Sequence, residues 1–179
     1  NLMVKKTKKL KIGNGMDNDT LLGPLTTKQR LEGVEKLVET TKKEGGKILL
    51  GGKRPANFNK GYYFEPTIFD KIKDNFTIMK EEPFGPIVPI LSFKDFDEVI
   101  ERSNKNDLGL CSYIYTNNLE KANRASELME TGCVAVNTAV VAVAEAPFGG
   151  IKQTGYGREG GSMAIKDYLN IKYTHFGIS

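Results

Sequence analysis

The chain has 179 residues, of which 39% are hydrophobic and 27% charged, and its formal net charge is +4. This composition is typical of a globular protein with one core of ordinary size. No apolar run reaches the length of a membrane span and the start resembles no signal peptide, so we expect a cytoplasmic protein without a membrane partner. The positive charge gathers in a lysine cluster at Lys5, Lys6, Lys8, Lys9 and Lys11. Because no aromatic residue alternates with these lysines, a solvated helix or arm is favoured over a nucleic-acid site.

The first half of the chain predicts one helix followed by three strands. The helix begins near Thr26 and ends before Gly45, and four apolar side chains recur on one of its faces. These are Leu31, Val34, Leu37 and Val38. Strands are expected in KILLGG (47–52), in YYFEPTIFD (62–70) and in GPIVPILSF (85–93).

The second half alternates in the same way. Asp95 with Glu98 forms a capping box that opens a helix, and SYIYT (112–116) follows as a strand. Asn118 can cap a second helix that closes at Gly132, with GCVAVNT (132–138) as the next strand. We expect this helix to turn Leu119, Ala122, Ala125, Leu128 and Met129 inward. Apolar strands alternating with helices predict an α/β fold with a largely parallel sheet covered by helices.

The glycine-rich segment FGGIKQTGYGREGG (148–161) contains the G-x-G-x-x-G pattern of a dinucleotide-binding loop between Gly155 and Gly160. That loop requires a buried strand before its first glycine and a helix opening at its last one. Here a polar, glycine-rich stretch precedes Gly155, and too few residues follow for a βαβ unit. We therefore expect these glycines to serve another purpose than holding a phosphate.

A second irregular segment, EEPFGP, runs from Glu81 to Pro86. Two prolines stiffen it, so a carboxylate beside them can accept two hydrogen bonds from neighbouring hydroxyls, as on a ribose, while the phenylalanine ring offers a flat apolar face. The alternative is a solvated glutamate pair beside a structural turn, which is the commoner situation for surface carboxylates.

Other kinds of catalytic chemistry find little support in the sequence. A metal site is not expected, because His175 is the one histidine and no cysteine or carboxylate cluster has ligand spacing. Cys111 and Cys133 lie in apolar runs, which predicts buried, unreactive thiols without a disulfide. Neither has an adjacent histidine or lysine that would activate it as a nucleophile.

Together these segments resemble the NAD(P)-dependent aldehyde dehydrogenases. EEPFGP is similar to that superfamily's E-x-F-G-P motif, and APFGGIKQTGYGREGG is similar to its P-F-G-G-x-K-x-S-G-x-G-R-E segment. IGNGMDNDTLLGPL also resembles a family segment, so the likeness runs nearly end to end. Among subfamilies, AEAPFGG with YLNIKYTHFG resembles the succinate-semialdehyde dehydrogenase group.

The resemblance implies an enzyme that oxidises an aldehyde, such as succinate semialdehyde, with NAD or NADP. Glu82 would take the hydroxyls of the nicotinamide ribose, Phe84 would lie against the nicotinamide, and Phe148 would border the aldehyde tunnel. Ala142 stands where succinate-semialdehyde enzymes place a serine that holds the substrate carboxylate, and an alanine offers no hydrogen bond. The glycines of Gly155 to Gly160 would serve close packing behind the tunnel and at a subunit contact.

The family's catalytic cysteine, oxyanion asparagine, general-base glutamate and nucleotide-binding domain would all lie upstream of this chain. By resemblance the chain is thus a C-terminal portion with no catalytic residue of its own and inactive alone. Residues 1–166 would form part of the catalytic domain, and 167–179 an apolar strand through which a homo-oligomer assembles. The alternatives are a strand folded back on its own domain and a non-catalytic module that pairs through this tail.

Overall fold

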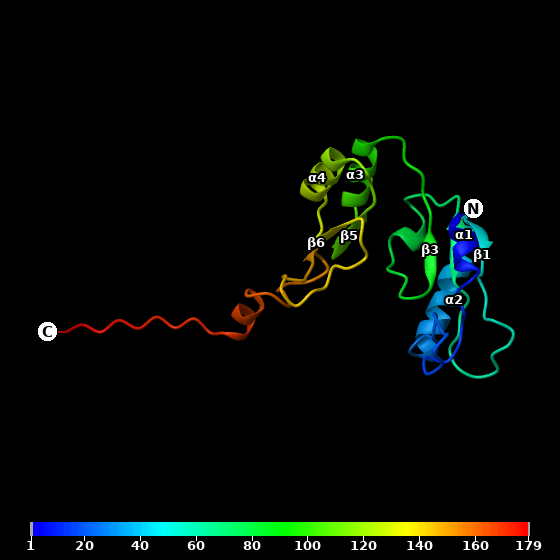
Figure 1. The fold of residues 1–179 in the computed structure, drawn as a ribbon, viewed down its shortest axis with the longest axis horizontal. Helices are drawn as coiled ribbons and strands as arrows, with labels where there is room; N and C mark the ends of the chain where they lie inside the picture. The colour runs from blue at the N-terminus through cyan, green and yellow to red at the C-terminus, as the bar shows by residue number, and fades with distance from the viewer. Residues whose placement is uncertain (1, 179) are drawn as a thin grey trace. The chain divides into compact units, whose positions relative to one another are not determined.

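The computed structural model describes residues 2–178. They fall into two units that meet in sequence between Ser92 and Phe93, and each is described by itself (Figure 1). No helix within 2–178 is both long and apolar enough to cross a membrane.

The first unit combines one long helix with a three-stranded sheet. Its helices are α1 (Leu2–Thr7), α2 (Lys28–Lys43) and the 3₁₀ turn η1 (Thr77–Met79), and its strands are β1 (Lys47–Leu50), β2 (Thr67–Asp70) and β3 (Ile87–Pro89). The sheet order is β1-β2-β3, in which β1 pairs antiparallel and β3 parallel to the central β2. The predicted helix and all three predicted strand regions are therefore confirmed.

Local signals define both ends of α2. Thr27 is the N-cap, and its side-chain oxygen accepts a hydrogen bond from the Arg30 backbone N–H at 3.1 Å. The helix ends at Lys43 with Glu44 as the C-cap, and Gly45 follows with a φ of 104°, which lies in the left-handed region.

The core of the first unit lies between α2 and the sheet. Its buried members are Leu31, Val34, Leu37, Val38, Phe64, Phe69, Ile72, Phe76, Ile78 and Ile87. All four apolar residues expected on the inner face of α2 are among them, so the periodicity identified the buried face correctly.

The second unit holds shorter elements. Its helices are α3 (Phe96–Asn104), α4 (Leu119–Leu128) and the 3₁₀ helix η2 (Ala164–Tyr168), and its strands are β4 (Leu108–Gly109), β5 (Cys111–Ile114), β6 (Cys133–Val136) and β7 (Ile151–Lys152). β5 and β6 pair parallel, whereas β4 and β7 pair antiparallel. Asp95 and Asn118 cap α3 and α4 as expected.

The inward face expected for α4 is only partly correct. Ala122 and Ala125 are buried, but Leu119 is 75% exposed and Leu128 is 46% exposed. These leucines are the two terminal residues of a ten-residue helix, beyond the part that packs on the unit. The two alanines therefore provide the contact, and the leucines leave apolar surface uncovered.

Beyond η2 the chain forms no helix or strand as far as residue 178, and it is drawn as an extended trace (Figure 1). Its apolar side chains are exposed, with Ile171 at 101% and Ile178 at 96%. The tail thus makes no strand pairing within the described chain, and its role in assembly remains a prediction.

Candidate functional site

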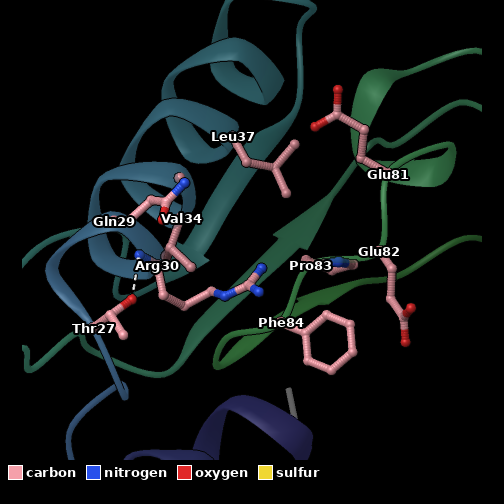
Figure 2. Close-up of a pocket in the computed structure, with 10 residues that line it drawn as sticks. Thr27, Gln29, Arg30, Val34, Leu37, Glu81, Glu82, Pro83 and Phe84 are labelled. Carbon is pink, nitrogen blue, oxygen red and sulfur yellow. Dashed lines mark hydrogen bonds between the residues drawn. The ribbon is translucent and has the colours of Figure 1, made fainter.

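A cavity of about 330 Å³ lies between the start of α2 and residues 81–84, and it includes two predicted site residues, Glu82 and Phe84 (Figure 2). Its lining is completed by Thr27, Gln29, Arg30, Gly33, Val34, Leu37, Glu81 and Pro83. This size is at the lower end of the range for small-molecule sites, roughly 300–1,000 Å³. The cavity belongs entirely to the first unit.

The segment that carries Glu82 and Phe84 is fixed from both sides. On the sheet side, the backbone N–H of Thr67 in β2 donates to the carbonyl oxygen of Pro86 at 2.7 Å. On the helix side, a Cβ added to Gly85 would lie 2.5 Å from Val34 Cγ2, so this residue must be small for the segment to approach α2. The neighbouring side chains are therefore presented by a well-anchored backbone.

Glu82 and Phe84 are available to a ligand. The Glu82 side chain is exposed and has no hydrogen bond or ion pair with any residue from 2 to 178. Figure 2 shows its carboxylate extending from the segment on the side away from α2. Phe84 is 60% exposed, which leaves apolar surface of its side chain uncovered.

Arg30 lines the same cavity, and sequence reasoning did not identify it. Its side chain reaches from the first turn of α2 toward Phe84 (Figure 2), and the guanidinium carbon lies 5.1 Å from the centre of the ring. This is within the range of a cation–π interaction. No local pattern indicates it, because the two residues are far apart in sequence and meet only through the packing of α2 against residues 81–86.

The other two predicted site residues lie in the second unit, in the loop between β6 and β7. Phe148 is half-buried and forms an antiparallel bridge with Glu159: its N–H donates to the Glu159 oxygen at 2.6 Å, and the reverse bond measures 2.7 Å. Ala142 is exposed on the same loop. The structure thus fixes the backbone of Phe148 and leaves Ala142 at the surface.

Much of the glycine-rich segment is closely packed. A Cβ added to Gly160 would lie 2.7 Å from the Ala146 oxygen, and one added to Gly149 would lie 2.6 Å from the Gly157 oxygen. Gly155 differs, since its surroundings are open and its φ of 125° alone favours glycine. The segment is followed by turns and the 3₁₀ helix η2, so the α-helix that a phosphate loop requires is missing at this place.

The cysteines are placed differently from the expectation. Cys111 and Cys133 are half-buried neighbours on the parallel strands β5 and β6, outside the buried core. Burial, and secondarily Cys133, raises the pKa of the Cys111 thiol, which disfavours a reactive thiolate. Among residues 2–178 no group of histidine, cysteine, aspartate or glutamate side chains could hold a metal ion.

Comparison with known proteins decides the family. The model of the "Aldehyde dehydrogenase family" matches residues 1–174. The chain belongs to this family. It is 41% identical over 177 residues to the chloroplastic betaine aldehyde dehydrogenase of Atriplex hortensis, covering 99% of this chain and 35% of that protein. It is 43% identical over 165 residues to the glutarate-semialdehyde dehydrogenase of Pseudomonas putida, covering 92% and 34%.

Solved aldehyde dehydrogenases share the fold. The NAD⁺ complex of an aldehyde dehydrogenase from Bacillus cereus is 40% identical, with a TM-score of 0.92, over 96% of this chain and 34% of that one. The chain therefore spans about a third of the length of the aldehyde dehydrogenases that it matches. The expected family and its α/β fold are confirmed.

Proposed function

We propose that this chain forms part of a longer aldehyde dehydrogenase, which oxidises an aldehyde to a carboxylic acid with NAD or NADP, and that its share is to hold the nicotinamide half of the cofactor. The observation that carries the proposal is the anchored segment 81–84 at the rim of the cavity. It presents an unpaired carboxylate on the side away from α2 and an exposed aromatic ring.

The chemistry of these side chains fits a nicotinamide nucleoside. An ionised carboxylate has two oxygens that accept hydrogen bonds. Neither carboxylate oxygen of Glu82 accepts one from another residue within 2–178. A ribose supplies the two hydroxyl donors. The face of Phe84 offers an apolar surface to the planar nicotinamide. When bound, the cofactor would accept the hydride that leaves the substrate.

Loss of a charge-assisted hydrogen bond costs on the order of 1.5–3 kcal/mol, so Glu82→Gln should lower kcat/KM for the cofactor by about tenfold or more. The test uses the complete protein that carries this chain. Glu81→Gln is the matched control, because Glu81 lines the same cavity but is not the residue assigned to the ribose. The proposal fails if the two variants behave alike, or if the wild-type protein oxidises no aldehyde with either cofactor.

For the substrate we propose a semialdehyde such as succinate semialdehyde. Support comes from the resemblance of AEAPFGG to the succinate-semialdehyde dehydrogenase group and from the glutarate-semialdehyde dehydrogenase among the relatives. Ala142 supplies no hydrogen bond, so a substrate carboxylate would have to be held by cationic side chains elsewhere in the enzyme. Turnover of succinate semialdehyde compared with betaine aldehyde tests this assignment. A clear preference for the cationic aldehyde would overturn it.

For assembly we propose a homo-oligomer through the tail 167–179. Its exposed apolar side chains, such as Ile171 and Tyr173, would form an aggregation-prone edge unless a partner covers them. Truncation before Asp167 should then yield smaller soluble species in light scattering. Circular dichroism should show that the α-helices and strands are retained, although the cut removes the last two residues of η2. If the truncated protein keeps the full oligomeric mass, the tail folds back on its own domain instead. A complete protein that assembles but is inactive would favour the non-catalytic module.

A further inference from the structure

We propose that Arg30 positions the ring of Phe84 for the nicotinamide, an inference that rests on the proposed function and adds a residue to it. The guanidinium carbon lies 5.1 Å from the ring centre, and both residues line the same cavity (Figure 2). Arg30 is a positioning residue in this proposal, since it acts on the cofactor through Phe84.

Phe84 needs such support from its surroundings. Its backbone is anchored, but the residue is 60% exposed, so its ring has few packing contacts to fix its orientation. A cation over the ring face favours one orientation and covers one side of the ring, and the other side stays open to a planar ligand. The ring would then be ordered before the cofactor arrives, which lowers the entropic cost of binding.

The backbone of Arg30 is held in place, but an arginine at this position does not stabilise α2. Its backbone N–H donates to Thr27 Oγ1 at 3.1 Å, so it occupies the first turn. A cation is unfavourable there, because the amino end of a helix carries partial positive charge. Arg30 also forms no ion pair with any residue between 2 and 178. Among residues 2–178, its contact with Phe84 is thus the one charge-based interaction of this side chain.

The experiment measures the dissociation constant of NADH by fluorescence titration of the complete protein. A cation–π contact at an exposed site corresponds to a change of roughly two- to fivefold in an equilibrium constant, so Arg30→Ala should weaken NADH binding by about that factor. Arg30→Lys keeps the charge and should recover most of the loss. Lys36→Ala is the matched control, because it removes a cation from an exposed position of α2 that does not line the cavity, and it should bind as wild type does.

A double-mutant cycle separates positioning through Phe84 from a direct contact. In a Phe84→Leu background no ring remains, so adding Arg30→Ala should weaken NADH binding no further. Time-resolved fluorescence of bound NADH should also report a more heterogeneous nicotinamide environment in Arg30→Ala, which a general loss of stability would not produce.

Three results would overturn the inference: wild-type affinity in Arg30→Ala, an equal loss in the Phe84→Leu background, or no recovery by Arg30→Lys. These results are distinguishable from failure of the proposed function. In that case the wild-type protein itself would bind no NADH and oxidise no aldehyde, whatever residue stands at position 30.

Discussion

Gly132→Ala tests the packing around the loop that carries Pro147, Phe148, Gly149 and Gly150. Gly132 precedes β6, and a Cβ added there would lie 2.8 Å from the Gly149 carbonyl carbon, 3.0 Å from Gly150 Cα and closer still to the Gly149 oxygen. All three atoms belong to backbone, which cannot rotate away as a side chain can. The loop or the strand must therefore move.

The expected cost follows from this overlap. Overpacking in a well-packed region costs typically 1–3 kcal/mol, and we expect about 3 kcal/mol because all the atoms that the Cβ would meet belong to backbone. The displacement also affects function. Gly149 adjoins Phe148, which would border the aldehyde path, and a misplacement on the order of 1 Å can lower a rate about 10²-fold.

Hydrogen exchange measured by mass spectrometry is the suitable assay, because the two units can respond separately. In Gly132→Ala we expect faster exchange in β6, whose Cys133 N–H donates to the Leu110 oxygen at 2.9 Å, with unchanged exchange in α2. Gly177→Ala, whose added Cβ meets nothing within 4 Å, should change neither. Protection of β6 as in the wild type, or an equal loss in the Gly177 variant, would refute the packing argument.

Two further predictions concern stability. Gly33→Ala should stabilise the first unit by about 1 kcal/mol, because Gly33 lies inside α2, its added Cβ would meet nothing within 4 Å and alanine has the higher helix propensity; an unchanged or lower urea midpoint would contradict this. For Cys111, burial raises the pKa of the thiol in the folded state. The protonated thiol therefore contributes to the free energy of unfolding below the pKa of the unfolded thiol, and this contribution is lost as pH rises through the folded pKa. Above about pH 8.5 the wild type should therefore lose more urea resistance than Cys111→Ser, and parallel pH profiles would show that the thiol contributes nothing.

The sequence predicted those parts of the fold that local chemistry determines. The capping side chains of Thr27, Asp95 and Asn118 each accept the backbone hydrogen bond that begins their helix. Periodicity failed where a helix is short. The α4 pattern made Leu119 and Leu128 appear equivalent to the alanines between them, but only the middle of that helix is covered.

The candidate site shows the same division. Glu82 and Phe84 belong to one stiff segment, and their residue types alone indicated a candidate binding role. The structure places both at a cavity. Arg30 joins them only because Gly85 allows this segment to lie against Val34 of α2. Such a contact depends on how two distant segments pack, and no spacing along the chain encodes it. The same is true of Cys111 and Cys133, which the pairing of β5 with β6 brings together.

The most direct test of the central proposal is a crystal structure of the complete protein with its nicotinamide cofactor. The distance to measure joins the Glu82 carboxylate oxygens to the hydroxyls of the nicotinamide ribose. We predict hydrogen-bond distances of about 2.5–3.0 Å to both hydroxyls, with the ring of Phe84 beside the nicotinamide. A ribose held by other residues, with Glu82 still facing solvent, would contradict the proposed function of this cavity.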